Sequence, residues 1–267
     1  MNNMQSRRLW FVLITAAPVL LSACLNEIRV PLKTARFQLP EVSERIFASN
    51  ISINQQTGSD VVIVENADQS PPDDKTSYVT SGDGIATGGD AAITILPRTE
   101  IALSYARGTY LIGGKVQVLG PAREQSTKGD LSLAVSAGYG YNQLDETDDS
   151  GRLRWKANYK VKMLDASAIL GYRVGQRWLL YGGPFYQTYD VAGKLNQLNS
   201  TTGASLGEFD IDSSGHFYGV NFGFEFFLNQ NRKFSLLTEG SRGTANFKNT
   251  YSNESPLNIA VAVRAFF

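Results

Sequence analysis

The last ten residues, 258–267, read NIAVAVRAFF and decide the fold of this chain. Read with a period of two, one face is entirely apolar and consists of Ile259, Val261, Val263, Ala265 and Phe267. This periodicity is typical of a β-strand. In water, an apolar strand that ends on an aromatic residue would form an aggregation edge unless something covered it. The pattern therefore predicts a terminal strand whose outer face meets an apolar medium.

The N-terminal stretch MNNMQSRRLWFVLITAAPVLLSAC has the layout of a secretory signal peptide. Arg7 and Arg8 precede an apolar run over 9–21, which is too short for a bilayer-spanning helix of about 20 residues. The two arginines also resemble a twin-arginine export signal. We interpret them as the positive region of an ordinary signal, because a lipid-facing domain cannot fold before export.

Cys24 is the only cysteine, so it has no disulfide partner within the chain. Together with residues 21–23 it resembles the bacterial lipobox, in which a lipid is added to the cysteine and the signal is cut just before it. The resemblance implies a signal peptide over 1–23, a lipidated tether over 24–44 and a mature domain over 45–267. Leu25 stands where an aspartate would hold such a lipoprotein in the inner membrane, so the resemblance points to the outer membrane. The alternative is an ordinary signal peptide followed by a chance cysteine.

Composition favours one β domain. The chain has 267 residues, 25 of them glycine, with a formal net charge of zero and 42% hydrophobic residues. The equal numbers of basic and acidic residues argue against a nucleic-acid partner, because a protein that binds nucleic acid would have an excess of basic residues. After Leu21 no apolar run approaches the length of a membrane helix. If the mature chain enters a membrane, it must do so as a closed barrel, because every backbone polar group in hydrocarbon needs a partner.

Alternation along the chain supports that architecture. Residues 130–142 place leucine, valine and tyrosine on one face and serine, alanine and glycine on the other. Residues 217–227 place Phe222 and Phe224 outward, with Gly223 and Glu225 opposed. A small and polar opposite face fits a crowded, hydrated lumen. In residues 157–173 the apolar phase changes after Met163, which predicts a β-bulge there.

Turn lengths complete the prediction of an all-β fold, a single antiparallel transmembrane β-barrel. The turns near Leu96, Val174 and Asn229 are tight, whereas the connections 144–155, 193–207 and 247–255 are long and polar, as expected for periplasmic turns and outer loops. Residues 66–90 are expected to form another long loop, and 120–130 a longer turn on the short side. We expect ten strands, with eight as the alternative, at about 45–54, 91–96, 99–106, 110–119, 130–142, 157–173, 178–193, 207–228, 232–248 and 256–267.

The lipobox, the alternating C-terminal strand and the pattern around LPRTEIALSYARG resemble small outer-membrane β-barrel proteins of Gram-negative bacteria, in a lipid-anchored variety. The resemblance implies that Val261, Val263 and Phe267 carry the signal read by the barrel-assembly machinery. Ala265 departs from the family, where an aromatic residue is common. The implied partners are outer-membrane lipids and lipopolysaccharide, together with the barrel-assembly and lipoprotein-export machinery.

Three stretches could carry chemistry. His216 follows Asp210, Asp212 and Ser214, a set of residue types that hydrolases use, although a polar loop rim is the alternative interpretation. The acidic stretch 145–151 could bind Ca²⁺ or form a solvated loop. The glycine-rich stretch 81–90 lacks the lysine of a phosphate-binding loop and is interpreted as a flexible loop. We therefore predict no catalytic residues, metal site or cofactor.

Charges on the predicted inward faces carry more information. Buried charges persist only when they are paired or hydrated, so these side chains are expected to form a network that plugs the lumen. A pair between Glu239 and Arg264 is expected on the last two strands. The function predicted is a non-enzymatic envelope scaffold or surface-contact protein. A narrow channel, a membrane-bound hydrolase and a soluble lipocalin-like lipoprotein are the alternatives. The predicted network consists of Glu100, Lys115, Asp165, Arg173, Glu225, Glu239 and Arg264.

Overall fold

The computed structural model describes residues 25–66, 76–82, 84–148, 153–199, 201–229, 231–248 and 250–267. The predicted signal peptide over 1–23 and Cys24 lie outside these ranges. The described residues form strands and connections throughout. The strands are β1 (Leu25–Leu32), β2 (Ser49–Gln56), β3 (Ser59–Asn66), β4 (Thr76–Ser81), β5 (Ala86–Leu96), β6 (Thr99–Ala106), β7 (Thr109–Leu119), β8 (Leu131–Asp148), β9 (Leu153–Arg173), β10 (Trp178–Asn199), β11 (Ser205–Phe227), β12 (Phe234–Phe247), β13 (Thr250–Ser252) and β14 (Asn258–Phe266).

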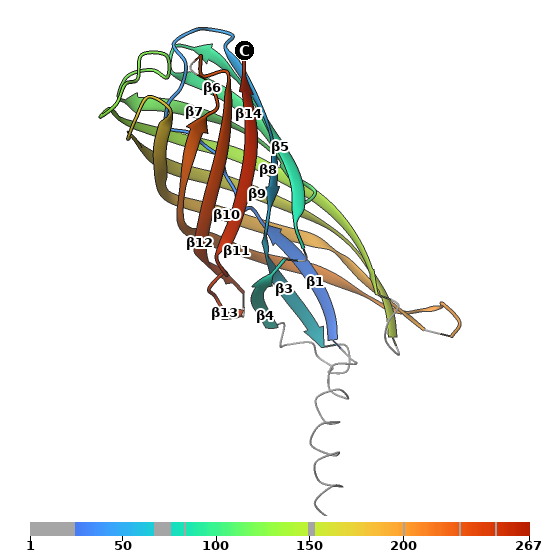
Figure 1. The fold of residues 1–267 in the computed structure, drawn as a ribbon. Helices are drawn as coiled ribbons and strands as arrows, with labels where there is room; N and C mark the ends of the chain where they lie inside the picture. The colour runs from blue at the N-terminus through green and yellow to red at the C-terminus, as the bar shows by residue number, and fades with distance from the viewer. Residues whose placement is uncertain are drawn as a thin grey trace, which may run out of the picture.

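Ten of these strands close into one barrel, in the order β10-β11-β12-β14-β2-β5-β6-β7-β8-β9 (Figure 1). All neighbours are antiparallel, and β14 pairs with β2 to close the ring, from Ala260 opposite Gln56 to Phe266 opposite Asn50. The predicted ten-stranded barrel is confirmed. Its first strand is β2, and the segment before Thr99 belongs to the barrel as β5.

Among the described residues, no α-helix has the length and apolarity of a membrane span.

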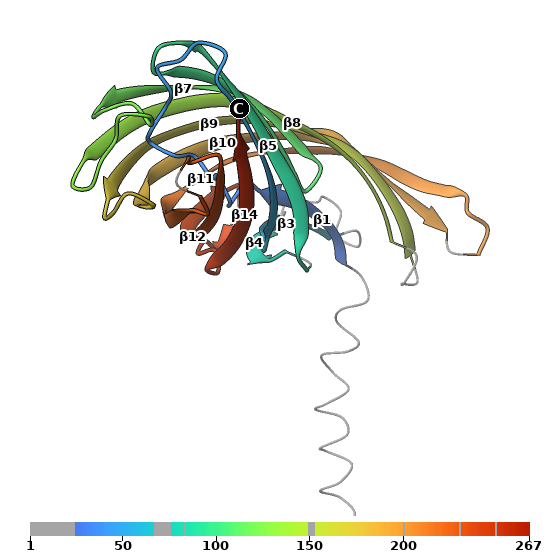
Figure 2. The same ribbon diagram turned by 45° about the horizontal axis from the view of Figure 1, so that its top comes forward.

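The barrel wall is uneven in height. Strands β8 to β11 have between 18 and 23 residues, whereas β2 and β6 have 8 residues each. A tilted strand crosses a bilayer in about 9 to 11 residues. The long strands therefore project well beyond the short side, as Figures 1 and 2 show. We call this part the projecting wall.

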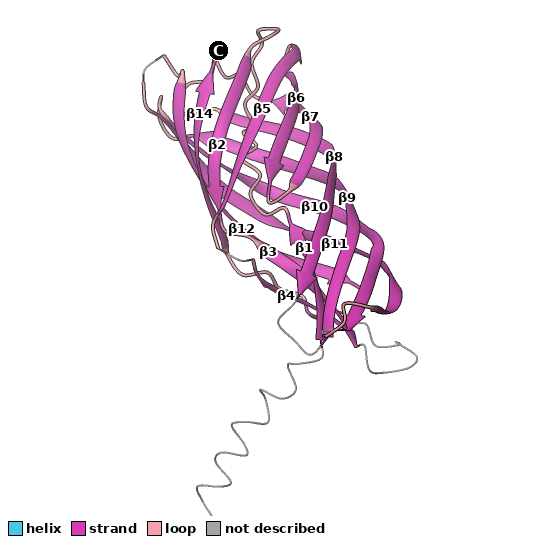
Figure 3. Ribbon diagram, turned by 90° about the vertical axis from the view of Figure 1, so that its right-hand side faces the viewer, coloured by secondary structure: helices cyan, strands magenta, loops and turns pink. Residues whose placement is uncertain are grey.

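The two ends of the barrel differ in their connections. The end with the C-terminus, called proximal here, has the turns at 97–98, 174–177 and 228–233 and the longer connection 120–130. The opposite, distal end has the extended hairpins of the projecting wall and the small sheet described below (Figure 3). The connections predicted to be long at 144–155 and 193–207 are short in the structure, because β8 to β11 extend through most of both ranges, to Asp148, Leu153, Asn199 and Ser205. The two ends differ instead in how far their strands extend.

The outer surface of the barrel has a belt of exposed apolar side chains. At the distal edge of this belt the rings of Tyr105 and Tyr110 are in contact, with centroids 4.7 Å apart. A closed barrel with such a belt faces lipid, with aromatic residues at its edge. The belt includes Ile51, Ile53, Ile101, Leu103, Ile112, Val116, Val135, Leu164, Leu170, Leu180, Val220, Phe222, Val261 and Val263.

The bulge predicted at Met163 is wrong. Strand β9 pairs with β10 without a register shift, from Leu179 opposite Arg173 to Asn199 opposite Leu153. Odd-numbered residues of β9 face inward throughout, including Tyr159 and Met163. The apolar phase changes because the environment changes. In the projecting wall the inner face packs in an apolar core, and the outer face has left the belt for water.

That core is completed by a second, four-stranded sheet in the order β1-β3-β4-β13. Ile28, Val30 and Val61 from this sheet belong to one buried apolar cluster with Trp155, Val191 and Leu195, which are inward residues of the projecting wall. The sequence predicts a long loop over 66–90. In the structure Asn66 ends β3, residues 76–81 form β4, and 86–90 begin β5. Neighbouring strands make these polar stretches regular by supplying backbone partners.

Candidate functional site: the threaded lumen

Residues 25–43 do not lie outside the barrel as a tether. They pass through its lumen, and contacts with the single strand β9 show their direction. The Tyr159 hydroxyl donates to the Arg29 carbonyl oxygen, at 2.6 Å. Asp165 pairs with Arg36, and Arg173 pairs with Glu41. As the N-terminal segment advances toward residue 43, its partners on β9 advance toward the proximal turn. We call residues 33–43 the plug segment.

At the distal end, β1 anchors the segment. It pairs with β3 over its whole length, from Leu25 opposite Asn66 to Leu32 opposite Ser59. The Tyr78 hydroxyl on β4 donates to Glu27 Oε1 at 3.2 Å. Burial, followed by the nearby Glu27 carboxylate, raises the pKa of Tyr78, so this phenol stays protonated and can donate. Backbone and side-chain bonds thus hold the start of the described chain in the small sheet.

In the middle of the lumen, a bidentate ion pair ties the plug segment to the wall. Arg36 Nη1 and Nη2 donate to the two carboxylate oxygens of Asp165 at 2.7 and 2.5 Å. Both side chains are 1% exposed. Gln187 Nε2 adds a third donor to Asp165 at 2.8 Å. The arginine also lies over the Phe185 ring, 5.1 Å from its centroid. A carboxylate with three donors is well satisfied despite its burial.

Glu239 binds the backbone of the same segment. Its two carboxylate oxygens accept from the backbone N–H groups of Arg36 and Phe37 at 2.7 and 2.9 Å. The Tyr181 hydroxyl donates to the same carboxylate at 3.3 Å. An extended segment inside a barrel has no ladder of its own to satisfy these N–H groups. Glu239 therefore takes the place of a neighbouring strand.

The proximal end is closed around Glu41. Its carboxylate pairs with Arg173, whose side chain is fully buried, and accepts from the Ser126 hydroxyl at 3.1 Å. Lys115 Nζ donates to the Leu39 carbonyl oxygen at 2.7 Å. Ser126 belongs to the connection 120–130, so the long turn noted in the sequence folds over the proximal opening and contacts the plug.

The seven predicted lumen charges all project inward. Six of them have less than a tenth of their surface exposed, and Glu100 is the exception. Glu100 and Lys115 pair with each other at 2.7 Å. Asp165, Arg173 and Glu239 bind the plug segment instead of one another. Within the described residues, Glu225 is fully buried and both of its carboxylate oxygens have no hydrogen-bond donor. Its assignment to a network therefore stays a prediction.

The predicted pair between Glu239 and Arg264 is wrong. Arg264 lies opposite Ser235 on the neighbouring strand and Glu239 lies opposite Ala260, so the two charges are separated along the strand pair. Arg264 Nη2 instead donates to the Phe37 carbonyl oxygen at 2.7 Å. Both charged side chains thus bind the backbone of the plug segment at adjacent points. The plug, which the strand pattern did not reveal, separates them.

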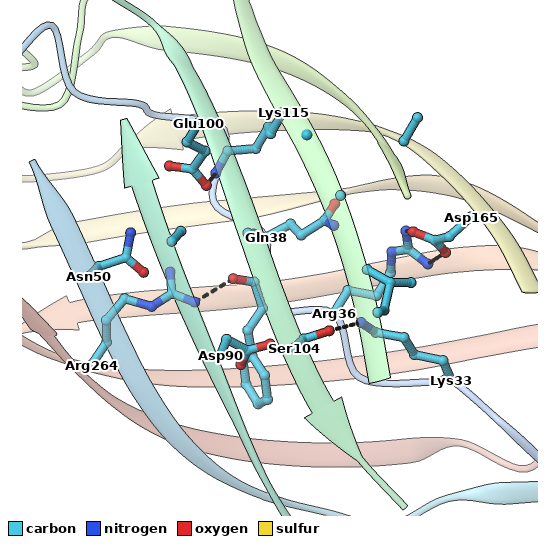
Figure 4. Close-up of a pocket in the computed structure, with 17 residues that line it drawn as sticks. Lys33, Arg36, Gln38, Asn50, Asp90, Glu100, Ser104, Lys115, Asp165 and Arg264 are labelled. Carbon is cyan, nitrogen blue, oxygen red and sulfur yellow. Dashed lines mark hydrogen bonds and ion pairs between the residues drawn. The ribbon is translucent and has the colours of Figure 1, made fainter. Parts of the chain in front are cut away.

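A small polar cavity of about 40 Å³ remains beside the plug (Figure 4). It opens where inward residues of the neighbouring strands are small, as at Ala92, Ala102 and Gly113. Lys33 Nζ donates to the Ser104 hydroxyl across it, at 2.5 Å. Such a volume holds only a few water molecules. Among the described residues, the lumen beside the plug therefore has room for a few water molecules but no wide aqueous path.

His216 does not form a catalytic group with its neighbours. It projects outward at the distal edge of the belt and stacks between Tyr186 and Tyr218, with centroid distances of 5.8 and 5.9 Å. Asp210 and Asp212 are also exposed on the outer face of β11, farther along the strand. A shared face of one extended strand does not bring acid, base and nucleophile together. His216 instead takes an interfacial aromatic position.

The remaining predicted sites have these positions. Val261, Val263 and Phe267 are exposed on the apolar belt and at its proximal edge, and their role in assembly stays a prediction. Asp145 accepts a hydrogen bond from Asn158, while residues 149–152 of the acidic stretch lie outside the described ranges. Within the parts of the chain that the structure describes, no three metal-binding side chains are grouped.

Ten antiparallel strands, an apolar outer belt and a filled lumen define the class: a transmembrane β-barrel with an internal plug. No known family model matches the sequence, and no curated protein matches it.

Solved barrels resemble the structure at low sequence identity. The attachment invasion locus protein Ail of Yersinia pestis, in complex with a heparin analogue, has 12% identity and a TM-score of 0.36, covering 84% of this chain and all of its own. The outer-membrane protease OmpT of Escherichia coli has 10% identity and a TM-score of 0.45, covering 86% and 99%. The translocator domain of NalP from Neisseria meningitidis has 10% identity and a TM-score of 0.32, covering 83% and 88%. At these values no activity is transferred to this chain.

Proposed function

We propose that this protein is a plugged outer-membrane β-barrel lipoprotein of a Gram-negative bacterium that serves as an envelope scaffold and surface-contact protein. The observation that carries the proposal is the plug segment. It is held by buried ion pairs at Asp165 and Arg173 and by Glu239. These contacts fill the lumen of a barrel that would be narrow even when empty. The filled lumen therefore leaves no room for a path wide enough to transport a solute.

The orientation follows from the connections. In outer-membrane barrels the short turns lie on the periplasmic side and the long loops outside. By this rule the proximal end faces the periplasm and the projecting wall stands on the cell surface. Lipidation of Cys24 belongs to the same proposal and rests on the lipobox, because that residue lies outside the described ranges.

Surface contact is supported by the projecting wall. Its inner face is packed against the small sheet, so the wall is braced and is not a free hairpin. Its outer face alternates in charge from strand to strand, with lysine prominent on β9 and carboxylates on β11. Such a surface suits polar partners. The exposed charged residues are Asp145, Lys156, Lys160, Lys162, Asp190, Lys194, Glu208, Asp210 and Asp212.

The test distinguishes a role in the structure of the envelope from a role in surface contact. Residues 197–207 are replaced by Asn-Gly, which leaves Asn196 opposite Glu208, as in the native ladder. The shortened barrel should still migrate differently on detergent gels before and after boiling. Attachment of expressing cells to surfaces or to each other should fall. Unchanged attachment, with the shortened protein present at the native level, would refute the contact function.

A narrow ion path is the second candidate, and the polar cavity beside Lys33 and Ser104 favours it. Planar-bilayer recording discriminates between the two. A closed scaffold gives no stable conductance steps at neutral pH, whereas an ion path gives small and reproducible ones.

A further inference from the structure

The start of the described chain lies at the end of the barrel that carries the long hairpins. In Figures 1 and 3, β1 lies at the distal end together with β3 and β4, away from the C-terminus. The plug segment then runs toward the proximal end, where the backbone N–H of Arg98 donates to the Ser43 carbonyl oxygen at 3.0 Å. Strand β2 begins there, at Ser49, and returns in the distal direction.

We infer that the N-terminus of the mature chain passes through the barrel to the cell surface. Acyl chains on Cys24 are then delivered to the outer-leaflet side of the membrane, not to the periplasmic side. The inference rests on the proposed orientation and lipidation and adds the side on which the lipid lies. From the sequence, residues 24–44 were expected to form a tether before the first strand, not a segment that crosses the lumen.

The length of the path supports a complete crossing. Tyr159 and Arg173 are 14 residues apart on β9, which is about 46 Å along the strand at about 3.3 Å per residue. With a strand tilt of about 40°, the axial distance is about 35 Å, compared with an apolar band about 25 Å tall. Their partners Arg29 and Glu41 are 12 residues apart, and a nearly extended chain of that length spans at most about 42 Å. The segment therefore crosses the membrane inside the barrel in nearly extended form.

Contacts at each level fix this path. Lys33 N–H donates to the Tyr189 hydroxyl at 3.0 Å near the distal core. Arg36 binds Asp165 in the middle. The backbone N–H of Val42 donates to Gln117 Oε1 at 2.8 Å near the proximal end. Gln117 on β7 and Glu239 on β12, which binds the backbone of Arg36, stand on opposite sides of the closed ring, so the segment cannot leave the lumen sideways. A lipid attached just before Leu25 has no route to the inner leaflet while the barrel is closed.

The test labels single cysteines on intact cells with a membrane-impermeant maleimide. Glu27→Cys reports the N-terminal segment, Thr202→Cys on the exposed β10–β11 hairpin reports the distal end, and Lys128→Cys on the exposed 120–130 connection reports the proximal end. The parent protein, with Cys24 alone, is the control for a free thiol. We expect labelling of Glu27→Cys and Thr202→Cys on intact cells, and of Lys128→Cys only after the outer membrane is permeabilised.

Each other pattern has a definite meaning. If Glu27→Cys behaves like Lys128→Cys while Thr202→Cys is labelled on intact cells, the N-terminus is periplasmic and the inference is overturned. If only Lys128→Cys is labelled on intact cells, the proposed orientation is inverted and the surface location of the N-terminus fails with it. Labelling of the parent on intact cells refutes lipidation but supports a surface N-terminus, since Cys24 then reports its own position.

Discussion

The ion pair between Arg36 and Asp165 should couple the plug segment to the barrel wall. Both side chains are 1% exposed, so no solvent can take over the charge of either one when its partner is removed. Replacing one member of such a buried pair costs about 3 to 5 kcal/mol. We expect this loss in the free energy of unfolding for Arg36→Met and for Asp165→Leu.

The double variant Arg36→Met/Asp165→Leu should be more stable than either single variant. It removes both members of the ion pair and leaves without a partner only the Gln187 N–H that donates to Asp165, because the same amide nitrogen also donates to the Lys33 carbonyl oxygen. One buried donor without a partner costs about 1 to 3 kcal/mol. The measurement is urea unfolding of the refolded barrel in lipid vesicles, followed by tryptophan fluorescence and by migration on unboiled gels.

A matched control uses the exposed pair between Arg98 and Glu44, which also joins the N-terminal segment to the barrel. Its side chains are 37% and 39% exposed, and pairs of this kind contribute less than about 1 kcal/mol. Glu44→Gln should therefore change the free energy of unfolding little. If the losses at Arg36 and Asp165 are additive in the double variant, the two side chains are not coupled and the threaded path is wrong at its central contact.

Four further outcomes follow from the structure. Phe222→Arg, in the apolar belt, should cost about 2 to 4 kcal/mol and Tyr218→Arg, at the belt edge, about 0 to 1 kcal/mol; equal losses in vesicle unfolding would contradict the placement of the belt. Cys24→Ser should abolish incorporation of radiolabelled fatty acid, and label on that variant would refute the lipobox assignment. A refolded chain that begins at Glu44 should conduct ions through the emptied lumen, unlike the full mature chain, and a closed barrel in both cases would refute the plug. His216→Ala should leave any hydrolytic activity of purified protein unchanged, because this ring stacks on tyrosines; loss of such activity would restore the hydrolase hypothesis.

The strands of the barrel could be predicted because lipid imposes one rule on every outer face. Alternation places residues such as Val135 and Phe222 outward wherever the strand crosses the belt. The rule fails where the strand leaves lipid. At Met163 the sequence shows the switch from an apolar outer face to an apolar inner face, and without the environment that switch resembles a bulge.

The plug was missed for a different reason. Ile28, Val30 and Leu32 alternate with Arg29 and Pro31 and would have indicated a short strand, but the lipoprotein leader made a tether the expected structure. The inward direction of the lumen charges was predictable, since it follows from strand parity. The partners of these charges were not predictable, because the odd or even position of a residue in its strand gives only the face of its side chain. It says nothing about a segment that is not part of the ring. Arg36 and Glu41 bind side chains more than a hundred residues away in sequence.

The seam between β14 and β2 joins the last strand of the ring to the first and encloses the plug segment, which Arg264 of β14 contacts at the Phe37 carbonyl oxygen. The N-terminal segment is thus threaded through a closed ring formed by the rest of the same chain. If Cys24 carries acyl chains, as proposed, this bulky group could not be drawn through a lumen that side chains already fill. In that case closure of the ring around the plug segment must be the last topological step of assembly. A pull on the N-terminus would load the contacts of this segment before any bond of the seam, among them the pairing of β1 with β3 and the ion pair between Arg36 and Asp165.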